Sequence, residues 1–140
     1  MRVLLDTNVI LDLFLDRAPF ADAAATLWLA HEREQLSAYV AAITPVNLFY
    51  IALKLRDEKT ARQAVVELLA TLNVCTIDQG TLKSALSLPF RDYEDAVQHA
   101  AANAAGLEAI ITRNVKDYSA ATLPILTPEA FVQQYLPILD

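Results

Sequence analysis

The sequence predicts an α/β fold in which a parallel sheet is covered by helices on both faces. Short apolar runs typical of buried strands alternate with longer amphipathic segments typical of helices along the 140 residues. Polar residues follow several of the apolar runs directly, as they do where parallel strands end at the edge of a sheet. Since this length suits one α/β domain, we expect a single domain over residues 1–140.

The first half of the chain is predicted to contain two strands and four helices. Val3-Leu4-Leu5 is too short for a helix and reads as a buried strand, and Asp6 then precedes a helix that continues to Leu15. Thr44 reads as an N-cap, because Pro45 follows at the position where a helix tolerates proline. The other elements expected here are a helix over 19–34, a strand over 37–41, and helices over 44–55 and 57–72.

The second half is predicted to contain three strands and three helices. Asp78 begins a short helix, and Asp92 caps a longer one that reaches Ala105. Gly106 then suits the left-handed conformation that commonly ends a helix. The remaining elements are strands over 74–77, 109–112 and 124–126, and a last helix that begins at 127–129.

Composition limits the classes of function. The net charge of −6 and pI near 4.8 argue against a broad basic face for nucleic acid, and they permit either carboxylates that hold cations or a basic protein partner. No apolar run approaches the ~20 residues that cross a bilayer, and Asp6 interrupts any signal-peptide core. We therefore expect a cytoplasmic protein without membrane contact. The single cysteine, Cys75, lies in an apolar run and is expected to be a buried structural thiol.

Acidic residues lie at the beginnings of two predicted helices. Asp6 follows the first predicted strand, where it suits either a metal ligand or a plain N-cap, the commoner role for such a residue. Asp92, Glu94 and Asp95 share one helical turn. The helix dipole explains one or two acids there, and a third makes a bound cation more attractive. His99 shares a face with Asp95, although a packing or solvated histidine is the more ordinary interpretation.

A polar segment follows the strand predicted over 109–112. Thr112, Asn114 and Asp117 offer hydroxyl, amide and carboxylate oxygens, while Arg113 and Lys116 are the paired cations near these motifs. The mixture suits a site for metal and phosphate, with Arg113 and Lys116 as candidate contacts to substrate phosphates. An ordinary solvated loop is the alternative for the two cations.

Together these motifs resemble the PIN-domain (PilT N-terminus) family, which includes the VapC-like toxin ribonucleases. The matching segments are 3–12, 92–96, 111–114 and 117–118, in the family's order and over essentially the whole chain. The resemblance implies a three-layer α/β/α fold with a five-stranded parallel sheet and an acidic pocket at the strand ends. It also implies endonuclease chemistry that depends on Mg²⁺ or Mn²⁺ and acts usually on RNA.

By position, Asp6 matches the family's first acid and Asp95 its late-helix acid, so both are predicted metal ligands and catalytic residues. Glu94 and Asp117 are predicted auxiliary catalytic acids. The sequence departs from the family at Asn47, where a glutamate is common, and at Asn114, where an aspartate is common. It resembles a PIN subgroup with asparagine at both positions. The residues expected to orient water or ligands are Asn8, Asn47, Asp92, Thr112 and Asn114.

The favoured function is a metal-dependent endoribonuclease, which would be the toxin of a pair if an antitoxin protein blocks its pocket. One alternative is a PIN-like module of weak or absent activity that binds RNA or protein, which Asn47 and Asn114 favour. A hydrolase acting on a small molecule ranks last, because the chain lacks a phosphate-binding loop. Large apolar residues over 20–29 and 47–55, including Trp28, Phe49 and Tyr50, belong to the core or to a homodimer face.

Overall fold

The computed structural model describes residues 1–136 and contains a five-stranded sheet in the order β3-β2-β1-β4-β5. Each pair of neighbouring strands is parallel. The strands are β1 (Arg2–Leu5), β2 (Ser37–Ala41), β3 (Asn73–Cys75), β4 (Ala109–Ile111) and β5 (Ile125–Leu126). The predicted α/β class and the five-stranded parallel sheet are confirmed.

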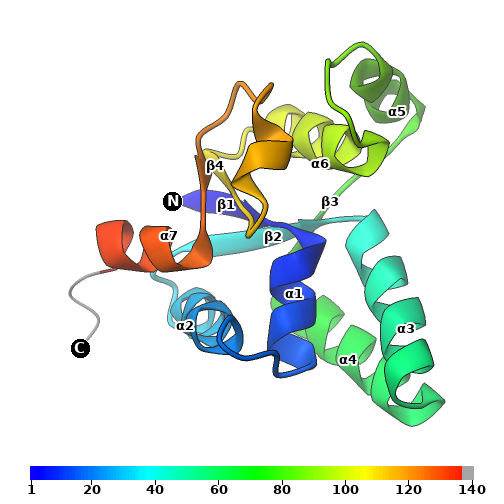
Figure 1. Cartoon of the computed structure of the whole chain (residues 1–140), viewed down its shortest axis with the longest axis vertical. Coiled ribbons are helices and arrows are strands. Elements are labelled where there is room, and N and C mark those ends of the chain that lie inside the picture. Colours follow the sequence, from blue (N-terminus) through cyan, green and yellow to red (C-terminus); the bar gives the residue numbers. More distant parts are fainter. Residues whose placement is uncertain (137–140) are drawn as a thin grey trace.

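Helices cover both faces of this sheet. In Figure 1, α5, α6 and the 3₁₀ helix η1 lie on one side of the strands, and α1, α2, α3, α4 and α7 lie on the other. The helices are α1 (Thr7–Phe14), α2 (Ala21–Glu32), α3 (Ile43–Leu55), α4 (Glu58–Thr71), α5 (Gln79–Leu86), α6 (Tyr93–Ala104), η1 (Val115–Tyr118) and α7 (Pro128–Tyr135). Within residues 1–136, none of these helices has the length and apolar character needed to span a bilayer.

Strand β1 lies at the centre of the sheet and is buried on both faces. Val3 and Leu5 point into the core shared with α1, α2, α3, α4 and α7, whereas Leu4 points into the core on the α6 side. All three side chains are at most 1% exposed, and full burial of such a side chain stabilises the fold by roughly 1.5–3 kcal/mol. The chain therefore leaves the middle of the sheet at Asp6, at the edge where all carboxyl ends of the strands meet.

The start of α3 differs from its predicted start. The helix begins at Ile43, and its N-cap residue Ala42 has no side-chain hydrogen bond. Thr44 is therefore not the cap. Its buried hydroxyl lies 2.9 Å from the hydroxyl of Thr7 and ties α3 to α1 beneath the carboxyl edge of the sheet.

Other helix ends follow the expected chemistry. The carboxylates of Asp57, Asp78 and Asp92 cap α4, α5 and α6, and the hydroxyl of Thr127 caps α7. Gly106 has φ of +71° just after α6, as expected for a left-handed helix terminator. Cys75 is buried, and burial raises the pKa of its thiol to about 11, which agrees with a structural rather than a reactive thiol.

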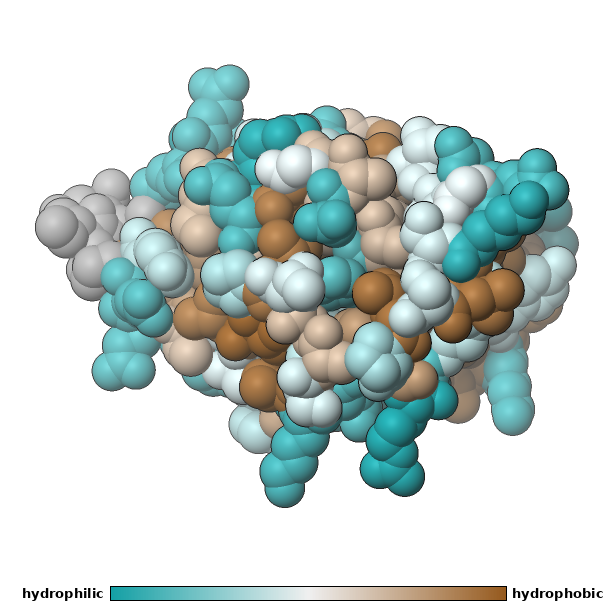
Figure 2. All heavy atoms as spheres, turned by 90° about the horizontal axis from the view of Figure 1, so that it is seen from above, coloured by the Kyte–Doolittle hydropathy of each residue, from teal (hydrophilic) through white to brown (hydrophobic). Residues whose placement is uncertain are grey.

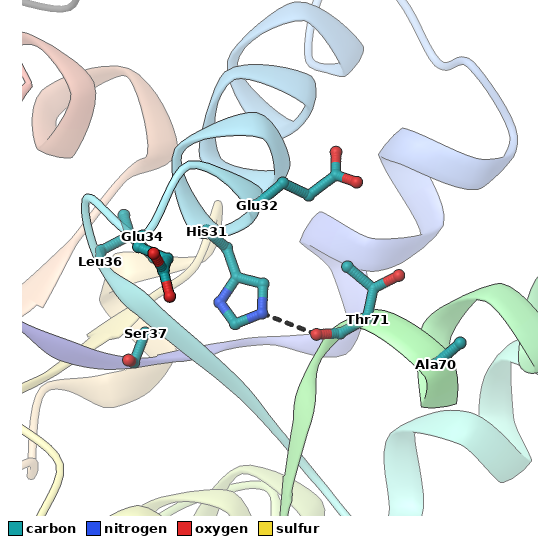
Figure 3. Close-up of a pocket in the computed structure, with 7 residues that line it drawn as sticks. All are labelled: His31, Glu32, Glu34, Leu36, Ser37, Ala70 and Thr71. Atoms are coloured by element: carbon teal, nitrogen blue, oxygen red, sulfur yellow. Dashed lines mark hydrogen bonds between the residues drawn. The ribbon is translucent and has the colours of Figure 1, made fainter.

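His31 joins three elements at the opposite edge of the sheet, where β2 begins. Its Nδ1 accepts from the Ala38 amide at 2.9 Å, so its Nε2 carries the proton and donates to the Thr71 carbonyl at 2.7 Å. Figure 3 shows the ring reaching from α2 towards Thr71, beside a pocket that also contains Glu32. This pocket is separate from the carboxyl edge.

Replacing His31 by alanine is expected to lower the free energy of unfolding by about 1–3 kcal/mol, because it leaves two backbone groups without partners. Urea denaturation measures the change. Glu32→Ala, an exposed neighbour on the same helix, serves as the control and should change stability by less than about 0.5 kcal/mol. Equal effects of the two variants would contradict the bridging role.

Candidate active site

Asp6 is held by several donors at the end of β1. Its backbone amide donates to the Ile111 carbonyl at 2.9 Å, which extends the pairing with β4 by one residue. Its side chain is 5% exposed and makes no capping bond, so the plain N-cap interpretation is wrong for the carboxylate. Instead it accepts from Thr112 Oγ1 at 2.7 Å, Gln98 Nε2 at 2.9 Å and Asn8 Nδ2 at 3.4 Å. These bonds fix its orientation towards α6.

Tyr118 connects the two carboxylates that the sequence singled out. Its hydroxyl lies 3.3 Å from Asp95 Oδ1 and 3.4 Å from Asp6 Oδ2, and it accepts from Gln98 Nε2 at 3.1 Å. Burial and the two negative charges raise the pKa of the phenol, so it stays protonated. Asp6 from the end of β1 and Asp95 from the first turn of α6 therefore face each other across one hydroxyl group.

The carboxylates around this point repel one another. Partial burial, followed by the charges of Asp6, Asp92 and Asp117, raises the pKa of Asp95 from its ordinary 3.8 to about 7. Desolvation and the charges of Asp92 and Asp6 also raise the pKa of Glu94. Such an arrangement is unfavourable without a counter-ion, and a bound cation would relieve it.

The raised pKa of Asp95 predicts a pH-dependent stability in the metal-free protein. The folded state holds a proton on Asp95 up to about pH 7, whereas the unfolded chain loses it near 3.8, so stability is expected to fall as the pH rises between these values. Solvent screening reduces the effect to roughly 1 kcal/mol. Urea denaturation in EDTA at pH 5 and pH 8 measures it, and Asp95→Asn should show a smaller drop than the wild type. An identical drop in both proteins would contradict the coupling.

Two asparagines contact this site, Asn47 through its side chain and Asn114 through its backbone amide. Asn47, in the first turns of α3, donates through Nδ2 to Glu94 Oε1 at 2.8 Å and thereby fixes the direction of that side chain. Asn114 lies at the other side, where its backbone amide donates to Thr112 Oγ1 at 3.0 Å. The Thr112 hydroxyl is thus orientated to donate to Asp6. Asp92 caps α6 through the Asp95 amide at 3.2 Å, as the capping interpretation expected.

The structure places Arg113 away from the acidic cluster. Its Nη2 lies 3.1 Å from Asp12 Oδ1, its Nε also donates to Asp12, and its guanidinium stacks 4.1 Å above the Phe20 ring. Asp12 is 1% exposed and also pairs with Arg17 at 3.3 Å. The expectation that Arg113 contacts substrate phosphate therefore finds no support in its geometry, since the group already neutralises a buried acid. Lys116 is exposed on η1.

Three functional candidates were missed in the sequence. Gln98 lies one turn after Asp95, so its helical spacing was a usable signal. Asp12 stands among apolar residues of α1, where a buried acid requires a partner. Tyr118 belongs to one of the segments that resemble the PIN-domain family, but its bond to Asp6 spans 112 positions and has no local signature. His99, in contrast, packs against Phe90 and accepts from the Thr122 amide, as the packing interpretation expected.

The donors present suit a hydrated divalent cation. Within residues 1–136 no three His, Cys, Asp or Glu side chains are close enough to enclose a metal by themselves. Mg²⁺ needs fewer, because it keeps several waters and often takes only one or two carboxylates. Gln98 Oε1, beside Asp6, is buried and has no hydrogen-bond partner among the described residues, so an acceptor is available for such a water. Asp6 and Asp95, with Glu94 nearby, fit this mode of binding.

Comparison with known proteins agrees with this fold. The PIN domain family model matches residues 2–116. A toxin–antitoxin complex from Klebsiella pneumoniae is 27% identical over 90% of this chain and 97% of that chain, with a TM-score of 0.67. VapBC2 from Rickettsia felis, solved with a DNA fragment from its promoter, is 16% identical over 89% and 97%, with a TM-score of 0.71.

A third solved structure is VapC20 from Mycobacterium tuberculosis, described as a toxin that cleaves the sarcin–ricin loop. It is 12% identical over 77% of this chain and 86% of that chain, with a TM-score of 0.63, which shows a shared fold. No curated protein sequence matches the chain.

Proposed function

Because the chain belongs to the PIN domain family, we propose that it is an endoribonuclease that hydrolyses RNA phosphodiester bonds with Mg²⁺ or Mn²⁺. The observation that carries the proposal is the position of the Tyr118 hydroxyl between the Asp6 and Asp95 carboxylates, at the carboxyl edge of the sheet. Open α/β sheets bind ligands at this edge. The repulsion among the acids supports a cation as the first of these ligands.

Each side chain has a proposed task. Asp6 and Asp95 hold the ion, and Thr112 and Gln98 keep the Asp6 carboxylate directed at it. A bound divalent ion would lower the pKa of an attacking water and neutralise charge on the phosphate. Glu94, whose pKa is raised by partial burial and by the neighbouring acids, is a proposed auxiliary acid of the site.

Asp117 is a further proposed acid of the site, since its charge contributes to the raised pKa of Asp95. Asn8, Asn47, Asp92 and Asn114 orient their neighbours rather than react. Lys116 is kept as the candidate contact to substrate phosphate, whereas we reassign Arg113 to neutralising Asp12.

Cleavage of a mixed pool of structured and unstructured RNA tests this function. The wild-type protein should cleave with Mg²⁺ or Mn²⁺ and should stop when EDTA is added. Cleavage that continues in EDTA would refute a metal-dependent mechanism. Absence of cleavage with either ion, across the pool, would favour the second candidate, a PIN-like module that binds RNA or protein. The two uncharged residues Asn47 and Asn114 support that candidate, because they leave the cluster with fewer acids.

A protein antitoxin is the proposed partner, because solved neighbours include VapBC and other toxin–antitoxin complexes. We also propose a homodimer through the outer face of α3, where Val46, Tyr50 and Leu53 are 50%, 63% and 38% exposed at helical spacing. Trp28 is not part of this face, because it packs edge-on against Phe14 beside the main core.

A further inference from the structure

A groove of about 260 Å³ lies beside the acidic cluster, between α3, α5 and α6. Its walls are the apolar side chains of Ile43, Ile77, Leu82 and Val97, and we call it the Tyr93 groove after the aromatic residue at its mouth. Drug-sized ligands occupy pockets of ~300–1,000 Å³, so this smaller groove suits a single ring system rather than a large molecule.

Tyr93 presents a fixed aromatic surface in this groove. Its side chain is 46% exposed, and its hydroxyl donates to the Leu82 carbonyl at 2.9 Å, which holds the ring between α6 and α5. Figure 2, which views the molecule from the side of α5 and α6, shows apolar side chains set among polar ones on this face. An exposed ring held in one orientation is the kind of platform on which unpaired bases stack.

A polar pair closes the end of the groove that faces the carboxylates. Asn47 Nδ2 donates to Glu94 Oε1, and both residues line the groove. The other Glu94 oxygen and the Asn47 side-chain carbonyl are not used in this bond and can accept hydrogen bonds from a ligand. Glu94 lines the groove and directly precedes Asp95 in α6, so the groove adjoins the acidic cluster. A nucleotide whose phosphate meets the cluster would bring its base to this groove.

We infer that the Tyr93 groove binds one unpaired base of the RNA next to the phosphate that is cleaved. The base stacks on Tyr93 between apolar walls and turns its donor edge to Glu94 and Asn47. Carboxylates accept from amino groups of bases, so adenine, cytosine and guanine fit this edge and uracil, which lacks an amino group, fits it less well. The inference rests on the proposed nuclease function and adds a substrate preference to it.

Binding of nucleotides tests the inference without requiring activity. AMP, CMP and UMP are titrated with Mg²⁺ into the ¹⁵N-labelled 15.4 kDa protein, and amide shifts are followed by NMR. AMP and CMP should shift amides that line the groove and bind more tightly than UMP. Tyr93→Ala should weaken AMP binding about ten-fold by removing the stacking surface, and Leu82→Phe should weaken it by filling the groove. The matched controls are Tyr135→Ala and Leu86→Phe, which change residues outside the groove and should bind AMP as the wild type does.

Several outcomes would overturn the inference. The first is that nucleotides shift only backbone amides of the acidic cluster. The second is that Tyr93→Ala binds AMP as tightly as the wild type does, and the third is that UMP binds as tightly as AMP. A basic, apolar peptide that fills the groove while nucleotides do not would assign it to a protein partner instead. Cleavage of the RNA pool by the same variants separates the two claims. If Leu82→Phe leaves metal-dependent cleavage unchanged, base binding in the Tyr93 groove is rejected and the nuclease function is retained. If nucleotides bind in the groove but no RNA is cleaved, the nuclease function is rejected and the groove remains a nucleotide-binding site.

Discussion

Asp6→Asn and Asp95→Asn are each expected to abolish metal-dependent RNA cleavage while the protein stays folded. Both changes keep the shape of the side chain and remove a charge that the cation requires. Altering groups that merely orient metal ligands costs roughly 10–100-fold, so loss of a ligand should reduce the rate by more than about 100-fold. Single-turnover cleavage of the RNA pool with Mg²⁺ measures the change. Circular dichroism and urea denaturation establish that each variant is folded.

The control for these variants is Asp22→Asn, which removes an exposed acid from the first turn of α2, outside the acidic cluster. Its cleavage rate should equal that of the wild type. Cleavage that persists in both Asp6→Asn and Asp95→Asn would remove the site assignment. Loss of cleavage in all three variants would indicate that net charge, and not the site, controls the rate.

Arg113→Met is expected to lower the free energy of unfolding by about 3 kcal/mol or more. Asp12 is 1% exposed, and among residues 1–136 removing its main partner leaves the buried carboxylate paired with the more distant Arg17 alone. Breaking a buried ion pair from one side typically costs about 3–5 kcal/mol. Urea denaturation measures the loss. The double variant Asp12→Asn/Arg113→Met should recover much of the stability, because it removes the stranded charge as well.

Lys116→Met is the matched control, since Lys116 is an exposed cation on the neighbouring 3₁₀ helix. It should change the free energy of unfolding by less than about 0.5 kcal/mol. If Arg113→Met is as stable as this control but cleaves RNA poorly, then Arg113 contacts substrate, as the sequence first indicated. A large stability loss instead supports its role beside Asp12.

The strands were accessible from the sequence because they depend on local rules, whereas the acidic pocket that contains Asp6 and Asp95 was implied by the resemblance to the PIN-domain family. Buried strands appear as short apolar runs, and the carboxyl ends of parallel strands meet at one edge. The predicted strand over 74–77 shows where such rules fail. The structure ends β3 at Cys75, and Ile77 packs beside the α6 core outside the sheet. Apolar character predicts that a residue is buried, but it does not predict whether the residue pairs with a neighbouring strand.

The hydrogen bonds that support the site were not accessible from the sequence. In the sequence, Gln98 is a polar residue within an alanine-rich helix. Nothing local predicts its bond to Asp6, which joins positions 92 apart. Thr44 is a residue type that commonly caps helices, yet tertiary packing directs its hydroxyl to Thr7. The sequence around Arg113 does not show its acidic partner, because the partner in the fold is Asp12, 101 positions earlier in the chain. Local sequence cannot specify partners that only the folded topology brings together.

Titration of Mn²⁺ into the purified protein, followed by electron paramagnetic resonance of the free ion, tests the central claim most directly. The wild-type chain is expected to bind Mn²⁺ saturably, and Mg²⁺ should compete for the same site. Asp6→Asn and Asp95→Asn should bind it at least about 10-fold more weakly, with Asp22→Asn unchanged. Binding of equal strength in the wild type and in both site variants would contradict a cation held between Asp6 and Asp95.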